Sequence, residues 1–126
     1  ERENIMTVLV EDTAPDLDTG IYNLITAAKA DYLKWTDRKS YPKMVEDFNN
    51  GFVVKFGSKY VKIMCGNGGT PGGSCWGFVV KNDTGKFKKG DILKPAGWSA
   101  PATNAARGNV LDGNYEIQWT GPLYLS

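Results

Sequence analysis

The chain has 126 residues, a formal net charge of +1, 41% hydrophobic residues and 23% charged residues. This length fits one folded domain, and the composition excludes a disordered or low-complexity chain. Histidine is absent, which excludes Ser-His-Asp and Cys-His catalysis and the usual catalytic zinc sites. We therefore assign no catalytic residue, no cofactor and no metal site, and expect a protein that is not an enzyme.

The first half of the chain carries the pattern of a short strand and two helices. Residues 5–10 are IMTVLV, a β-branched run that predicts a strand. Over residues 19–35 apolar side chains recur at three- and four-residue steps, which places them on one face of a helix. A second helix is predicted from Ser40 as N-cap and Pro42 in the first turn, ending at Asn50-Gly51 with a left-handed cap.

The segment before the first helix is acidic. Its carboxylates are Glu11, Asp12, Asp16 and Asp18, and their spacing does not match a calcium-binding loop. They are explained by a solvated segment whose negative charge favours the N-terminal end of the helix that follows.

Beyond Gly51 the pattern changes to short β-rich runs. FVVKF and YVKIMC, separated by Gly57-Ser58-Lys59, predict a hairpin, and its paired face is apolar apart from Lys62 if the turn pairs Phe56 with Tyr60. Three further strands are predicted at CWGFVVKN, DILK and YEIQWTG.

Two segments between these strands have their own interpretation. GNGGTPGGS, flanked by Cys65 and Cys75, predicts a flexible hairpin loop, since it lacks the Gly-Lys-Ser/Thr ending of a phosphate-binding loop. The two cysteines either close a short disulfide or stay reduced, and the absence of a secretion signal favours reduced thiols. SAPATNAARGN predicts a crossover helix or 3₁₀ turn that Ser99 caps and Gly108 stops.

These elements predict an α+β fold in a single domain, residues 1–126, with a helical segment 1–50 and a strand-rich segment 51–126. Two N-terminal helices pack on a small antiparallel sheet or on a five-stranded barrel of the SH3-like or OB-like kind. No apolar stretch approaches the roughly 20 residues needed to cross a bilayer. The protein is therefore expected in the cytoplasm, without membrane contact.

Basic charge is concentrated in the strand-rich segment. Residues 51–90 carry seven lysines against the single acid Asp83, whereas residues 1–50 carry ten acids against six bases. The lysines alternate with aromatic residues, as in small barrels that bind single-stranded nucleic acids. The alternative is that the aromatics fill the barrel and the lysines protect its edges from pairing with another chain.

Two residues of the last third extend this candidate site. Trp98 is an aromatic residue suited to a pocket wall, and Arg107 is the only arginine after Arg38. An arginine in a lysine-rich chain indicates a planar role with several donors, either clamping loop carbonyls, which is favoured, or meeting a ligand anion. The candidate contacts to a nucleic acid or an acidic protein partner are Lys55, Lys62, Lys81, Lys86, Lys88, Lys89, Trp98 and Arg107.

The stretches FKKGDILK, APATNAARGN and WTGPLYL carry a resemblance. In them the chain resembles a group of short uncharacterised proteins of tailed bacteriophages, including marine ones. The resemblance implies a viral accessory or host-takeover protein in the bacterial cytoplasm and assigns no residue a role. The resulting hypothesis is a non-enzymatic binding module of phage origin; the alternative is a structural or assembly protein that forms homo-oligomers.

Overall fold

The computed structural model describes residues 7–67 and 69–124. Within them the chain forms two helices and seven strands. In chain order these are β1 (Val8–Val10), α1 (Leu17–Trp35), α2 (Pro42–Asn50), β2 (Val53–Phe56), β3 (Tyr60–Asn67), β4 (Thr70–Val80), β5 (Ile92–Leu93), β6 (Tyr115–Gln118) and β7 (Gly121–Pro122). The expected class, mixed α+β with antiparallel sheets, is confirmed; residues 5 and 6 of the predicted first strand lie outside the described residues.

The strands divide between two sheets. One has four strands in the order β2-β3-β4-β5, and the other has three in the order β1-β6-β7. The predicted five-stranded barrel is wrong, because in the described part of the chain β6 pairs with β1 instead of closing the hairpin sheet. Val10 lies opposite Tyr115 and Val8 opposite Ile117, so the apolar side of each short strand finds its partner at the other end of the chain.

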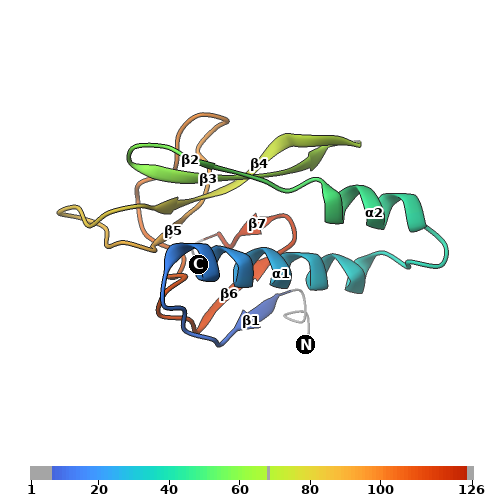
Figure 1. Cartoon of the computed structure of the whole chain (residues 1–126), viewed down its shortest axis with the longest axis horizontal. Coiled ribbons are helices and arrows are strands. Elements are labelled where there is room, and N and C mark those ends of the chain that lie inside the picture. Colours follow the sequence, from blue (N-terminus) through green and yellow to red (C-terminus); the bar gives the residue numbers. More distant parts are fainter. Residues whose placement is uncertain (1–6, 68, 125–126) are drawn as a thin grey trace.

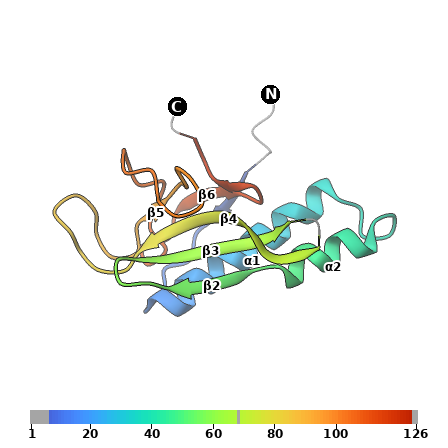
Figure 2. The ribbon, with the colours of Figure 1, turned by 90° about the horizontal axis from the view of Figure 1, so that it is seen from above.

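The two sheets and α1 enclose the main core. Figures 1 and 2 show α1 and the three-stranded sheet side by side under one face of the four-stranded sheet, with α2 at the far end of the β3-β4 hairpin. The core joins Leu24 and Ala28 of α1, Val61 and Ile63 of β3, and Ile117 of β6, all essentially inaccessible to solvent. The other face of the four-stranded sheet is turned away from α1, and we call it the outer sheet face.

Helix α1 begins where the acidic segment ends. Asp16 is its N-cap, and its carboxylate accepts a hydrogen bond from the Thr19 N–H at 2.8 Å. This hydrogen bond holds the pKa of Asp16 below its ordinary value. The helix therefore starts two residues earlier than its apolar pattern indicates, and Asp16 has the role expected of the acidic segment.

Both predicted caps of α2 are wrong. Tyr41 occupies the N-cap position without a side-chain hydrogen bond, because the Ser40 hydroxyl donates to Asp37 Oδ2 at 2.7 Å instead. Gly51 ends the helix at φ −89°, in the right-handed region. Glycine is needed there for a close approach, since a Cβ on Gly51 would lie 2.7 Å from the main chain of Gly66.

The β2-β3 hairpin forms as expected, but with a different register. Phe56 pairs with Val61 and not with Tyr60. Val54 and Phe56 therefore share the face of Val61 and Ile63, which is turned toward α1. The predicted apolar face placed Lys62 together with Val54 and Phe56, but Lys62 lies on the opposite face of the sheet from those two residues.

The predicted flexible loop and the predicted crossover helix are both absent from the described residues. Most of GNGGTPGGS lies in strands, because the β3-β4 pairing continues to Asn67 and Thr70. A register shift between the pairs Ile63–Gly77 and Met64–Cys75 leaves Trp76 as an extra residue, which is buried in the core. Residues 99–108 form no helix and are irregular, as is common where prolines at 95 and 101 deprive the backbone of donors.

Neither helix of the described chain has both the length and the apolar character that crossing a membrane requires.

Candidate functional site

Three of the predicted residues come together on the outer sheet face. Lys55 of β2 lies directly opposite Lys62 of β3. The Lys62 ammonium lies over the ring of Trp98, 3.6 Å from its centroid. Trp98 belongs to the loop after β5, which in Figure 1 rises past the sheet on the side away from α1, and about half of its surface is exposed (51%). The result is an exposed aromatic ring beside two neighbouring cations.

The other predicted lysines lie on the loop between β4 and β5 and make local contacts. Lys81 donates to the Gly57 carbonyl at 3.0 Å, and Lys86 donates to the carbonyl of Thr103. Lys88 forms an ion pair of 2.7 Å with Asp112, which raises the pKa of its ammonium. Lys89 lies close enough to the Asp16 carboxylate to help lower its pKa. The structure therefore does not join Lys88 and Lys89 to the lysines of the outer sheet face.

Arg107 has the clamping geometry that its residue type favours. Its guanidinium donates to the Ala105 carbonyl at 3.1 Å, to the Leu123 carbonyl at 2.7 Å and to Asn104 Oδ1 at 2.9 Å. These contacts tie the irregular segment before it to the residues after β7.

The cysteines are free thiols whose pKa values are raised by burial. Cys65 lies opposite Ser74 and Cys75 lies opposite Met64. Because neighbouring strand positions alternate between faces, the two side chains point to opposite sides of the hairpin, and a disulfide between them does not fit this geometry.

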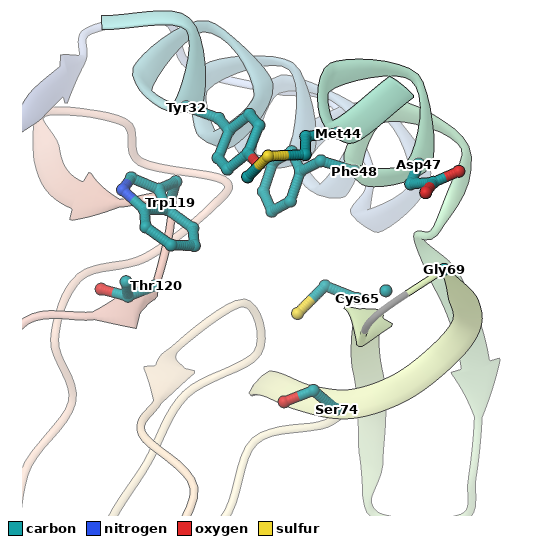
Figure 3. Close-up of a pocket in the computed structure, with 10 residues that line it drawn as sticks. Tyr32, Met44, Asp47, Phe48, Cys65, Gly69, Ser74, Trp119 and Thr120 are labelled. Atoms are coloured by element: carbon teal, nitrogen blue, oxygen red, sulfur yellow. The ribbon is translucent and has the colours of Figure 1, made fainter. Parts of the chain in front are cut away.

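A cavity that the sequence did not predict lies between the helices and the sheets (Figure 3). Its volume is about 390 Å³, within the range of small-molecule sites. One wall is aromatic and Met44 lies beside it; Asp47, Cys65, Ser74 and Thr120 are among the residues that complete the lining. We call it the aromatic pocket.

The aromatic wall forms a corner. Tyr32 of α1 stacks on Phe48 of α2, with ring centroids 4.1 Å apart and planes at 14°. Trp119, in the turn between β6 and β7, meets both rings nearly at right angles, at 77° and 86°. Two aromatic planes at about a right angle therefore line one cavity, supplied by the consecutive helices α1 and α2 and by the distant turn between β6 and β7.

The main chain of Trp119 is held from two sides. Its N–H donates to Asp31 Oδ2 at 2.8 Å, and its carbonyl accepts from the indole N–H of Trp76 at 3.0 Å. The Asp31 side chain is fully buried, and its Oδ1 makes no hydrogen bond among the described residues, with the Lys34 ammonium 4.0 Å away. A buried carboxylate that is only half satisfied costs stability. Here it fixes the position of one wall of the aromatic pocket.

The charge of the lining is negative. Asp47 is the only charged residue that lines the aromatic pocket in the described chain. Its carboxylate contacts Lys43 at 2.7 Å, but the lysine side chain is 78% exposed, so water and salt screen this ion pair strongly. The arrangement suits a ligand that is apolar and cationic, not an anion.

Sequence reasoning missed this pocket because Tyr32, Phe48 and Trp119 read as separate apolar positions of two helices and a turn. The stacking of α1 on α2 brings the first two together, and the distant β6-β7 turn supplies the third. No local spacing in the sequence links Trp119 to the two helices.

Comparison with known proteins identifies a family. No curated protein sequence and no solved structure matches the chain. A model of a protein family described as a family of unknown function, DUF7717, matches residues 10–125, which is most of the chain. The chain therefore belongs to the DUF7717 family of unknown function.

Proposed function

We propose that the protein is a non-enzymatic binding module whose outer sheet face contacts single-stranded nucleic acid. The observation that carries the proposal is the arrangement of Lys55, Lys62 and Trp98. Like charges directly opposite one another on paired strands are destabilising, and Lys55 and Lys62 are such a pair. An anion on this face would relieve their repulsion.

Trp98 favours a nucleic acid over an acidic protein as the source of that anion. Its ring is half exposed while the Lys62 ammonium covers part of it. Exposed aromatics beside basic residues let bases stack while phosphates meet the cations, and each stacked base contributes about 1–3 kcal/mol. An acidic peptide would use the lysines but gain little from an indole surface.

The test is fluorescence anisotropy of a labelled oligothymidylate titrated with the protein at several salt concentrations. Each phosphate neutralised on a single strand adds about −0.7 to the slope of log K against log salt. The double variant Lys55→Gln/Lys62→Gln should therefore reduce the slope by about 1.4. Trp98→Ala should weaken binding with the slope unchanged.

Lys88→Gln is the matched control, because Lys88 is already paired with Asp112, and it should bind like the wild type. A salt slope near zero for the wild type would refute the proposal. Binding of polyglutamate but not of the oligonucleotide would replace the nucleic acid with an acidic protein partner.

Self-association is the second candidate function, and the edge of the four-stranded sheet favours it. Strand β2 is the edge strand of the four-stranded sheet, and its free edge has no strand partner in the described residues. All four of its residues are exposed. Val54 and Phe56 lie there beside Tyr22 of α1, which is 69% exposed. An exposed apolar edge strand is a ready site for pairing with another chain.

Light scattering across a dilution series tests this candidate. An oligomer joined through β2 should become monomeric when Val54 is replaced by lysine, because a charge on an edge strand opposes pairing. Tyr41→Lys, at an exposed aromatic in the connection before α2, is the control and should leave the mass unchanged. A wild type that is monomeric at every concentration removes the candidate.

The proposed setting is a phage-infected bacterial cytoplasm. It rests only on the resemblance of FKKGDILK, APATNAARGN and WTGPLYL to short proteins of tailed phages. Cell fractionation after infection, with an antibody to the protein, tests it; recovery in the membrane fraction or in the medium would contradict it.

A further inference from the structure

We propose that the aromatic pocket binds a methylated ammonium group, carried by a small molecule or by a modified lysine side chain. The proposal concerns a site separate from the outer sheet face. Cys65, which lines the pocket, and Lys62 are three positions apart on β3, so they point to opposite faces of the sheet.

The shape of the aromatic wall supports this ligand class. The stacked pair of Tyr32 and Phe48 and the ring of Trp119, nearly perpendicular to both, line one cavity, and Tyr32 and Phe48 cover one face of each other. A tetrahedral ammonium group with several methyls fits a corner between perpendicular rings, whereas a flat ring lies against only one of them. Cations bind ring faces through the aromatic quadrupole, and methylated ammonium groups are bound in aromatic cages for this reason.

The charges around the pocket have the matching sign. Asp47 lines the cavity, and the buried Asp31 lies behind Trp119. No lysine or arginine is among the lining residues of the described chain; Lys43, which pairs with Asp47, and Lys34, 4.0 Å from Asp31, have side chains exposed enough for water and salt to screen them. A cation is therefore favoured over a neutral ligand of the same shape, and an anion is disfavoured.

The rigidity of the wall adds a third argument. Trp119 lies in a turn, where an aromatic side chain would ordinarily be mobile, yet both its N–H and its carbonyl are fixed by buried side chains. The N–H contact uses a carboxylate whose second oxygen is unsatisfied in the described residues. Binding sites need walls that supporting contacts position in advance. Here the two contacts hold the main chain of Trp119, the residue that supplies one ring of the cavity.

The experiment is an NMR titration of ¹⁵N-labelled protein with choline and with its neutral isostere 3,3-dimethylbutan-1-ol. Choline should shift the Trp119 indole N–H and the amides of Gly66 and Ser74 with a dissociation constant on the order of 1 mM, typical of a small, open site. The neutral isostere should bind about tenfold more weakly, because it lacks the cation–π attraction. A peptide with trimethyllysine tests the source of the ammonium group. Tighter binding of the peptide than of choline indicates a modified lysine side chain, and tighter binding of choline indicates a small molecule.

Two variants localise the effect. Trp119→Leu should weaken choline binding about tenfold, and because both contacts that hold residue 119 use its main chain, the turn keeps its supports. Asp47→Asn should weaken choline binding about threefold at low salt and less at high salt. Trp98→Leu is the matched control on the outer sheet face, where choline binding should be unchanged and oligonucleotide binding reduced.

Equal binding of choline and its neutral isostere would overturn the proposed charge recognition. The absence of shifts with choline in large excess over about 1 mM would overturn the site itself. Because Lys55→Gln/Lys62→Gln leaves the pocket intact, its choline titration separates a failure of this proposal from a failure of the nucleic-acid proposal.

Discussion

The contact between Asp31 and Trp119 makes a prediction that joins stability to the aromatic pocket. Replacing Asp31 by alanine leaves the Trp119 N–H without its acceptor and removes atoms from a side chain with no exposed surface. Replacing it by asparagine keeps the shape and a carbonyl oxygen that accepts the same hydrogen bond. The two variants share the loss of charge, so their difference reports the hydrogen bond and the packing, reduced by the cost of burying the asparagine NH2 where Oδ1 makes no hydrogen bond among the described residues.

The size of this difference follows from the geometry. A buried N–H left without a partner costs about 1–3 kcal/mol, and the small cavity at this fully buried position adds to it. We expect Asp31→Ala to be less stable than Asp31→Asn by about 2 kcal/mol. For a chain of this size that difference lowers the melting temperature by about 8 °C.

Urea unfolding followed by far-ultraviolet circular dichroism measures the difference, provided that the slopes with denaturant agree between the variants. Asp31→Ala should also broaden the NMR signal of the Trp119 indole, because the turn loses one of its two supports. Equal stability of the two variants, or a more stable alanine variant, would refute the reasoning that the carboxylate positions Trp119.

Three further predictions concern the scaffold. Gly20→Ala should destabilise the protein by about 1–2 kcal/mol in thermal unfolding, since a methyl there would lie 2.8 Å from a main-chain oxygen of the segment before β6. This overpacking exceeds the gain of about 1 kcal/mol in helix propensity. Thr26→Ala, on the exposed side of α1, is the control and should be neutral or slightly stabilising in the same experiment. Asp16→Ala should lower the melting temperature at neutral pH. Because the folded pKa of Asp16 is lowered, its stabilisation is complete above about pH 4 and is lost as the pH falls through the folded pKa, so the gap to the wild type should narrow in acid. Arg107→Lys should speed limited proteolysis within residues 95–108, because a lysine cannot reproduce three directed contacts.

Local elements were predictable because local chemistry determines them. The three- and four-residue steps of residues 19–35 specify α1, and the Gly57 turn specifies the β2-β3 hairpin. The caps of α2 were mispredicted because other contacts determine these positions. The Ser40 hydroxyl donates to Asp37 instead of capping the helix, and glycine is needed at position 51 because the main chain of Gly66 lies so close.

Pairing over long distances in sequence could not be predicted in the same way. The short strands β1 and β6 carry no signal that selects one another over the hairpin, so the barrel was a reasonable but wrong closure. The bulge at Trp76 is also invisible in the sequence, because one extra residue reverses which side chains are buried without changing the pattern of residue types.

The candidate site was predictable in part. Lysines at strand spacing indicated Lys55 and Lys62, and the scarcity of arginine indicated a clamp at Arg107, where the structure has its three contacts. Sequence could not show that Lys88 is paired with Asp112, nor that Trp98 crosses to the outer sheet face, because both depend on where two irregular loops run.

The pairing of β1 with β6 also bears on the order in which the chain folds. Thr7 Oγ1 donates to Glu116 Oε1 at 2.6 Å across a separation of 109 residues, so β1 has no strand partner in this sheet until β6 has been synthesised. The β2-β3-β4 hairpins need only short loops to close, and such local contacts form early because their closure entropy is small. During translation α1 can therefore pack on the four-stranded sheet first, and the pairing of β1 with β6 comes later in the assembly of the fold.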